Sequence, residues 1–516
     1  MTLLIADLVR TSAVVAATRS RKAKVTALAE TLATADRDEL PLVTSYLGGS
    51  LRQRRTGLGW RGLRMLPDPA AEPSLTVREV HDTFDRLAAL EGAGSQQART
   101  TAVADLFGRA TADEQRWLAG LVTGELRQGA LDAQVQEAMA AAAGVKTTAV
   151  RRAAMLAGST VAIATTAFDG EQALAAIGLE VGRPVLPMLA ASAPDVAAAM
   201  AKAAPDGVPV SVDTKLDGIR IQVHRSGDDV VIATRSLDDI THRLPEVVAL
   251  ARSLPSTQFV LDGEAIALDD DGRPRPFQET ASRTSMDAGV EVTAYFFDLL
   301  HLDGRDLLDA AGAERVAALE QLVPPASLVP RIVTSDPEEA QAYAERVVTG
   351  GHEGVVVKSL GAPYAAGRRG AGWVKAKPVH TLDLVVLAVE WGSGRRQGWL
   401  SNIHLGARNA STGADSDEHW VMLGKTFKGM TDEMLAWQTE RFTELATVDD
   451  PRADWVVPLR PEQVVEIALD GLQRSTRYPG GVALRFARVV RYRDDKRAEE
   501  ADTIESVRSM FPGGTV

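Results

Sequence analysis

The first 180 residues follow a helical repeat of hydrophobic and polar positions. Segments such as VREVHDTFDRLAAL and EQRWLAGLVTGELRQGALDAQVQEAMAAAAG are rich in Ala, Leu, Glu and Arg, with apolar residues at helical spacing. The apolar N-terminal stretch is interrupted by Asp7 and Arg10 and follows no basic segment, so we expect an amphipathic helix there rather than a secretory signal. The pattern predicts an all-α domain over residues 1–180.

The pattern changes to short, β-branched runs near residue 181. Runs such as VSVDTKLDGIRIQVHR and VTAYFFDLLHLDG predict a mixed α/β domain over residues 181–378. Beyond residue 379, strand-like runs separated by Gly-rich turns, with one helical interval near MTDEMLAWQTERFTELA, predict an all-β domain over residues 379–516. A small barrel suits that domain, and the OB-fold is one possibility. We therefore expect a multidomain protein.

Composition narrows the classes of protein. No apolar run reaches the roughly 18 to 20 residues that a membrane helix needs, so we expect a cytoplasmic protein without a membrane partner. The chain has no cysteine, which excludes disulfides, cysteine nucleophiles and cysteine-based zinc sites. The 8 histidines show no metal-binding spacing, so any metal site would use oxygen ligands, as Mg²⁺ prefers.

The charge pattern qualifies the acidic composition. A net charge of −12 argues at first against a nucleic-acid partner, whose phosphates attract basic residues. Basic residues nevertheless cluster within residues 19–24, 52–64 and 485–497. Each cluster alone is also compatible with an ordinary solvated face.

The segment TKLDGIR holds the sharpest chemical signal. Lys215 lies between two strand-like runs and is followed by Asp217, Gly218 and Arg220, which suits a lysine nucleophile with phosphate-binding charge nearby. The alternative is a β-hairpin turn, in which Asp217 and Gly218 reverse the chain and the basic side chains are solvated.

Further charged and aromatic groups end other apolar runs of the mixed domain. They are Glu264 in LDGE, Phe297 in YFFD, Glu353 before VVVK, and Lys375 and Lys377 in WVKAK. Each has a plain structural alternative as a turn, a core residue or a solvated strand end. Strands that end in functional groups are, however, how a sheet lines a cleft.

Together and in this order, these segments closely resemble the motif series of the covalent nucleotidyltransferases, specifically the ATP-dependent DNA ligases of the archaeal and eukaryotic replicative type. KLDGIR is similar to motif I, LDGE to motif III, FFDLLHLDG to motif IIIa, EGVVVK to motif IV, WVKAK to motif V and LRFARVVRYRDDK to motif VI. LRQGALDAQVQEA and PVLPMLA resemble the helical part of that family. The resemblance implies an all-α DNA-binding domain, an α/β adenylation domain and an OB-fold domain.

The resemblance also implies a role for each matched residue. Lys215 would attack the α-phosphorus of ATP and carry AMP, Asp213 would accept from the adenine amine, and Phe297 would stack on the purine. Phosphate, ribose and pyrophosphate contacts would come from Arg220, Arg235, Glu264, Arg369, Lys375, Lys377, Arg485, Arg488 and Lys496. Mg²⁺ or Mn²⁺ would be held by Glu264 and Glu353.

The implied function is the sealing of nicks in double-stranded DNA, without reading sequence, in replication, repair or recombination. We expect a monomer, and the sequence shows no motif for a sliding clamp or a repair partner. An RNA ligase or an mRNA-capping enzyme shares K-x-D-G, but the long helical region speaks against both. An NAD-dependent ligase normally carries a cysteine zinc module, which this chain lacks. A non-catalytic DNA-binding protein is the alternative outside the enzymes.

Overall fold

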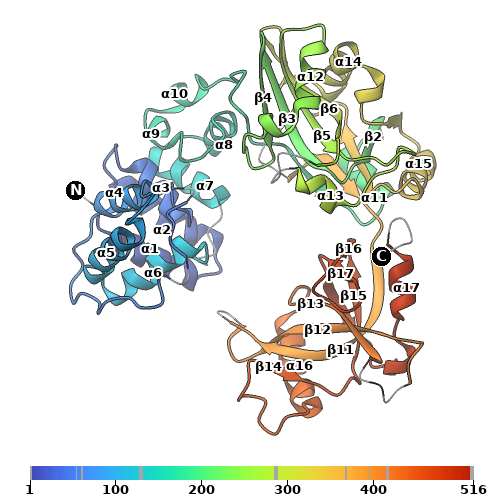
Figure 1. Ribbon diagram of the computed structural model, residues 1–516. Helices are drawn as coiled ribbons and strands as arrows, with labels where there is room; N and C mark the ends of the chain where they lie inside the picture. Colours follow the sequence, from blue (N-terminus) through green and yellow to red (C-terminus); the bar gives the residue numbers. More distant parts are fainter. Residues whose placement is uncertain are drawn as a thin grey trace.

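The computed structural model describes residues 3–53, 55–59, 62–126, 132–283, 289–365, 369–393, 396–413, 416 and 418–511. Figure 1 shows three bodies that follow one another along the chain: a helical body in blue and cyan, a mixed body in green and yellow, and a β-rich body in orange and red. The predicted order of an α, an α/β and a β region is confirmed. No helix within the described ranges is long and apolar enough to cross a membrane.

Short helices around one apolar core form the first region. In chain order they are α1 (Ile5–Ala17), α2 (Arg21–Thr34), α3 (Leu40–Leu47), α4 (Val77–Ala88), α5 (Ser95–Gly108), α6 (Ala112–Thr123), α7 (Asp132–Ala143), α8 (Thr147–Leu156), α9 (Ala164–Ala167) and α10 (Glu171–Ala175). Helices α4 and α6 begin with reciprocal caps, in which Thr76 pairs with Glu79 and Thr111 with Glu114. Such caps satisfy backbone N–H groups that have no partner inside the helix.

Helix α1 confirms the amphipathic helix predicted at the N-terminus, because it buries Ile5, Leu8 and Val15 along one face. Helices continue to Ala175 at the end of α10, and the first strand begins at Leu189. The domain limits predicted after residues 180 and 378 stay predictions.

The second region contains two sheets. Its elements are β1 (Leu189–Ser192), α11 (Val196–Ala203), β2 (Val210–Lys215), β3 (Ile219–Ser226), β4 (Asp229–Thr234), α12 (Pro245–Ser253), β5 (Gln258–Ile266), α13 (Phe277–Ser282), β6 (Thr293–Leu302), β7 (Arg305–Asp306), α14 (Gly312–Leu322), β8 (Arg331–Thr334), α15 (Pro337–Thr349), β9 (Gly354–Ser359) and β10 (Arg369–Ala376). One sheet has the order β1-β10-β9-β2-β8, and the other has the order β4-β3-β5-β6-β7.

Apolar clusters hold these layers together. Helices α11 and α15 pack on the first sheet, and α12 and α14 pack on the second. Between the sheets, Val260 and Leu300 of the second sheet share a cluster with Val356 and Trp373 of the first. The two sheets therefore pack against each other through this shared core.

The third region is built mainly from antiparallel strands. Its elements are β11 (His380–Trp391), β12 (Leu400–Arg408), β13 (Trp420–Thr426), α16 (Asp432–Leu445), β14 (Val456–Pro458), β15 (Val464–Leu469), β16 (Gly471–Arg474), β17 (Val482–Arg485), β18 (Arg488–Tyr492) and α17 (Ile504–Ser509). The main sheet has the order β13-β12-β11-β15-β18, β14 pairs with β11, and β16 and β17 form a separate pair. The expected all-β OB-fold region, with its one helical interval at α16, is confirmed.

Candidate active site

A cavity of about 690 Å³ opens where the two sheets of the second region meet the third region. Most of the predicted site residues lie in its lining, namely Asp213, Lys215, Arg220, Arg235, Glu264, Phe297, Glu353, Lys375, Lys377 and Arg485. They come from β2, β3, β5, β6, β10 and β17 and from residues next to β4, β9 and β10. The strand-end pattern in the sequence thus brings its charged groups to one place.

Lys215 is the last residue of β2 and lies beside Glu353. The register of β2 and β9 pairs Lys215 with Gly354, and the Lys215 ammonium forms an ion pair with the Glu353 carboxylate. Lys377 Nζ lies 3.0 Å from the other oxygen of Glu353. Burial alone would raise the pKa of Glu353, but Lys215 and Lys377 bring the pKa below its ordinary value. Two lysines therefore share one carboxylate at the cavity wall.

The segment after Lys215 does not form a hairpin. Strand β2 pairs with β8 and β9, whereas β3 pairs with β4 and β5, so residues 216–218 connect the two sheets. Gly218 is required at this link, because a Cβ there would lie 2.3 Å from the Ala265 carbonyl oxygen. Its N–H donates to Glu264 at 3.2 Å. The hairpin alternative is wrong, because β2 and β3 belong to different sheets. The sequence left it open because a local pattern does not show which strands pair.

Lys375 and Lys377 project from the end of β10 into the same charged cluster. Burial and the neighbouring ammonium groups lower the pKa of Lys375. Burial would also lower the pKa of Lys377, but its hydrogen bonds to Asp470 and Glu353 bring the pKa above its ordinary value. The side of the cavity around Lys215 is therefore rich in positive charge, as an anionic ligand requires.

Glu264 and Arg220 lie side by side on the second sheet, paired through the register of β3 and β5. Burial raises the pKa of Glu264 to about 7, although Lys215 and Arg220 act in the opposite direction. The Arg220 guanidinium donates to both oxygens of Asp262, at 3.0 and 2.7 Å. Tyr364 donates to the same carboxylate at 2.6 Å. Arg220 is thus held deep in the wall, and its predicted contact with phosphate stays a prediction.

Asp213 and Phe297 form the deep end of the cavity. Asp213 Oδ2 lies 2.7 Å from Lys358 Nζ, and the side chains of these two residues are only 2% and 9% exposed. The same ammonium lies 4.5 Å from the Phe297 ring centroid and 4.4 Å from the Trp373 ring centroid. This end combines a buried carboxylate with aromatic surface, which suits a flat, polar-edged ligand such as a nucleobase.

The predicted residues of the motif VI segment divide between two places. Arg485 Nη1 lies 2.7 Å from Asp217 and so reaches the second region. Arg488 Nη1 lies 3.4 Å from Asp470, at the edge of the cavity. Lys496 Nζ lies 2.6 Å from Asp383, at the start of β11 and away from the cavity lining. The Arg369 side chain and the basic residues Arg54 and Arg61 lie outside the described part of the chain.

Among the lining residues that sequence reasoning did not assign to the site are Lys358, Trp373 and Asp470. The two-residue repeat of a strand carries a signal for two of them. Trp373 shares a face of β10 with Lys375, and Lys358 shares a face of β9 with Val356, which also lines the cavity. Asp470 has no such signal, because it enters the site from another region.

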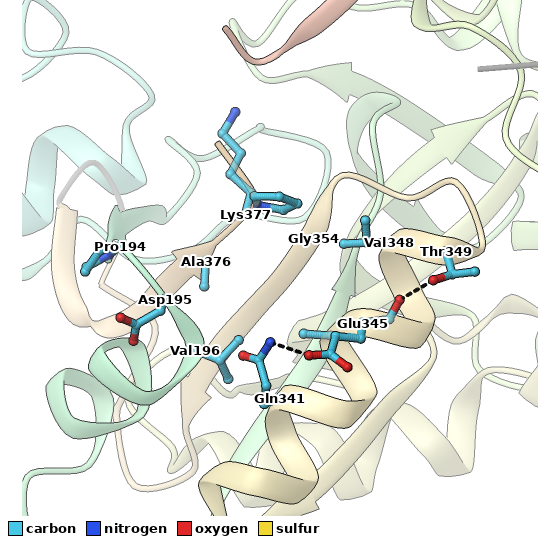
Figure 2. Close-up of a pocket in the computed structure, with 12 residues that line it drawn as sticks. Pro194, Asp195, Val196, Gln341, Glu345, Val348, Thr349, Gly354, Ala376 and Lys377 are labelled. Atoms are coloured by element: carbon cyan, nitrogen blue, oxygen red, sulfur yellow. Dashed lines mark hydrogen bonds between the residues drawn. The ribbon is translucent and has the colours of Figure 1, made fainter. Parts of the chain in front are cut away.

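A second cavity of about 360 Å³ lies between α11 and α15. Figure 2 shows Asp195 and Val196 on one side, and Gln341 with Glu345 on the other, where Gln341 donates to Glu345 at 2.9 Å. Lys377 borders both cavities, but in Figure 2 its side chain extends away from Gln341 and Glu345. Its ammonium instead contacts Glu353 and Asp470, so its charge serves the larger cavity.

Comparison with known proteins identifies the relatives of all three regions. The family described as ATP dependent DNA ligase domain matches residues 187–377, the DNA ligase N terminus matches residues 64–140, and the ATP dependent DNA ligase C terminal region matches residues 396–496. A probable DNA ligase of Nocardioides sp. is 70% identical, with 98% of this chain and 99% of that protein covered. A probable DNA ligase of Kineococcus radiotolerans is 64% identical, with 98% and 100% covered.

A solved structure shares the fold of nearly the whole chain. It is titled Pmar-Lig_PreS3, has a TM-score of 0.62 and 17% sequence identity, and covers 94% of this chain and 99% of that one. The order of the three regions is therefore found in a structure of very different sequence.

Proposed function

Because the chain belongs to the ATP-dependent DNA ligase family, we propose that Lys215 is the residue that carries AMP between ATP and nicked DNA. The observation that carries this proposal is the position of its amine, at the end of β2 in the wall of the large cavity and beside Glu353, Lys375 and Lys377. The ammonium groups of Lys375 and Lys377 suit a site that receives a triphosphate.

Three phosphoryl transfers follow from this assignment. The Lys215 ammonium first loses a proton to solvent. Its neutral amine then attacks the α-phosphorus of ATP, the bond to the bridging oxygen breaks, pyrophosphate leaves, and the nitrogen loses a second proton to solvent. An oxygen of the 5′-phosphate at the nick then attacks the same phosphorus, and the N–P bond breaks. Finally the 3′-hydroxyl attacks the 5′-phosphate, loses its proton and releases AMP. Positioning and charge neutralisation dominate such transfers.

The other predicted residues divide the ligand between them. Asp213 and Phe297 take the base at the deep end, where burial favours a stacked ring. Lys375 and Lys377 neutralise the α-phosphate, and Arg235 takes the ribose side. Arg485 and Arg488 reach the pyrophosphate from the third region, and Lys496 joins them only when that region moves. These roles are supported by the positions of all but Lys496 and Arg369 at the cavity.

Glu264 and Glu353 would supply two of the ligands of a divalent cation, because the described residues form no group of three or more side chains that could hold one alone. Both line the cavity with oxygen atoms, the donors that Mg²⁺ and Mn²⁺ prefer. A bound cation would supply neutralisation of phosphate charge. Loss of the Glu264 proton, which its pKa of about 7 makes easy at neutral pH, would give that residue its charge for this role.

Nicked duplex DNA is the partner that this chemistry requires. We infer that the helical region binds the phosphate backbone without reading sequence, and that the protein works as a monomer. The exposed basic residues Arg19, Arg52, Arg55 and Arg64 support such a surface.

The experiment that tests the proposal is formation of a covalent adduct. Incubation with ATP labelled at the α-phosphate is expected to label the protein, and Lys215→Ala is expected to abolish both label and nick sealing. Lys202→Ala is the matched control, because Lys202 is an exposed lysine on α11 outside the cavity. Label or sealing that persists in Lys215→Ala would overturn the assignment. Parallel incubations with GTP and NAD identify the nucleotide that the site accepts.

A further inference from the structure

Lys358 is a buried cation that the proposed transfer of AMP leaves without a role. Its ammonium lies 2.7 Å from Asp213 Oδ2 and donates to the Phe297 carbonyl oxygen at 3.3 Å. Burying a charge is costly unless an opposite charge and hydrogen bonds compensate it. The pair of Lys358 and Asp213 therefore forms one unit at the deep end of the cavity.

Asp213 is held on both of its oxygens. Ser211 donates its hydroxyl to Oδ1 at 2.5 Å, Lys358 lies against Oδ2, and Arg331 Nη2 lies 3.6 Å from Oδ2. An ionised carboxylate accepts hydrogen bonds and donates none. A ligand edge that docks against Asp213 must therefore present a hydrogen-bond donor.

Lys358 also fixes the aromatic surface next to that carboxylate. Its ammonium is within 4.5 Å of the centroids of both Phe297 and Trp373, whose rings meet edge to face with centroids 5.8 Å apart. A cation at this distance is attracted to the electron-rich ring. One side chain thus contacts both the candidate acceptor for the base edge and the candidate stacking ring.

We propose that Lys358 is a positioning residue that makes the deep end of the cavity selective for a base carrying an amino group, because it holds Asp213 as an acceptor beside Phe297. The inference rests on the proposed function, in which this cavity takes ATP. A 6-oxo purine would place its own acceptor against the carboxylate, so the base would gain no hydrogen bond there and the two oxygens would repel each other, which buried sites reject strongly. Without Lys358, Asp213 loses its nearest cation and the preference for a donor weakens.

The test compares ATP with purine riboside triphosphate, which lacks only the 6-amino group. The rate of adduct formation on Lys215 is measured against the concentration of each nucleotide, in the parent and in Lys358→Met. The parent is expected to favour ATP by about tenfold to a hundredfold in kcat/KM, the range of one hydrogen bond to a charged group. In Lys358→Met the ratio is expected to fall below about threefold, mainly through a higher KM for ATP.

A structural role alone would give another result. If Lys358 only stabilised β9, both nucleotides would react more slowly by the same factor and the ratio would be unchanged, which overturns the inference. Lys358→Gln provides a second variant that keeps a polar end without the charge, and it decides the question if Lys358→Met does not fold. Its ratio is also expected to fall.

Two further variants complete the design. Lys358→Arg keeps the cation and is expected to restore most of the ratio, and a ratio as low as that of Lys358→Met would count against the inference. Arg331→Met is the matched control, because its guanidinium lies 3.6 Å from Asp213 instead of 2.7 Å. It is expected to change the ratio less than Lys358→Met does, and the reverse order would overturn the assignment. A parent that forms no adduct refutes the proposed function, whereas a parent adduct with an unchanged ratio in the Lys358 variants refutes only this inference.

Discussion

The two regions that line the cavity hold their charges in different ways. In the second region, the pair of Lys358 and Asp213 is enclosed almost completely. On the side of the third region, the pair of Arg488 and Asp470 has side chains that are 42% and 20% exposed. The first set of contacts lies among aromatic and apolar side chains, and the second lies at an edge that solvent reaches.

The difference in burial implies a difference in how firmly each side is held. Breaking a buried ion pair by removing one partner costs about 3 to 5 kcal/mol, whereas an exposed pair contributes about 0 to 1 kcal/mol. The second region therefore offers a preorganised wall, whereas the edge that Arg488 and Asp470 form in the third region is held less firmly.

The largest expected effect comes from a buried pair in the second region. Arg315 and Asp298 are each 3% exposed, and Arg315 also donates to the Ala310 carbonyl oxygen at 2.7 Å. We expect Arg315→Met to lower the free energy of unfolding by about 3 to 5 kcal/mol, because Asp298 would stay buried without its cation. Chemical denaturation followed by fluorescence measures this.

The control for that variant is an exposed pair in the same region. Arg305 pairs with Glu314 through side chains that are 68% and 46% exposed. Arg305→Met is expected to cost less than about 1 kcal/mol. Equal losses in the two variants would contradict the contrast between buried and exposed pairs.

The second largest effect is expected from the pH dependence of stability, through the buried histidine His224 of the second region. Burial lowers the pKa of His224 to about 4. The Gly182 N–H donates to the ring of this histidine at 3.1 Å. The unfolded chain takes up a proton below about pH 6.5, whereas the folded chain keeps this ring neutral down to about pH 4. The neutral His224 ring therefore makes its full contribution to the free energy of unfolding above pH 6.5. As the pH falls to 4, this free energy decreases by up to about 3 kcal/mol.

The measurement compares the parent with His224→Gln from pH 7 to pH 4. Taking the difference between the two proteins removes the contributions of other titrating groups. The difference in the free energy of unfolding is expected to shrink as the pH falls through this window. A constant difference would show that this ring titrates like an exposed histidine.

The smallest expected effect concerns the contact between the regions. Lys377 Nζ lies 2.5 Å from Asp470, and both side chains are about one-fifth exposed. Asp470→Asn is expected to lower the free energy of unfolding by about 1 to 2 kcal/mol, because the pair is largely buried but the asparagine oxygen can still accept a hydrogen bond from Lys377. It should nevertheless increase the distance between the second and third regions, because this ion pair joins them.

Fluorescence energy transfer measures that distance, between donor and acceptor dyes attached to one introduced cysteine in each of the two regions. The chain contains no cysteine of its own, so only the introduced ones are labelled. The control is Glu462→Gln, which breaks an exposed pair with Arg460 inside the third region. An unchanged transfer efficiency in Asp470→Asn, with or without ATP, would contradict a separable contact.

The sequence predicted those parts of the fold and site that depend on local pattern. Alternation along β2 puts Asp213 and Lys215 on one face, and strands β5, β6 and β10 carry Glu264, Phe297 and Lys375 to the same cavity. The order of helical, mixed and β-rich regions likewise follows from the spacing of apolar residues. Each of these predictions needs only the neighbours of a residue along the chain.

Contacts between distant segments could not be predicted in this way. TKLDGIR is compatible with a hairpin as well as with a link between sheets, and only the pairing of β2 with β9 decides between them. Lys496 contacts Asp383, 113 residues away, although the resemblance assigns it to the nucleotide. Asp470 reaches Lys377 only because the third region packs where it does.

The two ion pairs of the Lys377 ammonium link the binding of an anion to the separation of the second and third regions. It bonds to Glu353 of its own region and to Asp470 of the next, and β11 begins only three positions after it, at His380. An anion that replaces Asp470 at Lys377 must bind more tightly when the two regions are apart. By thermodynamic reciprocity, separation of the regions raises the affinity for that anion by a certain factor, and binding of the anion raises the equilibrium constant for separation by the same factor.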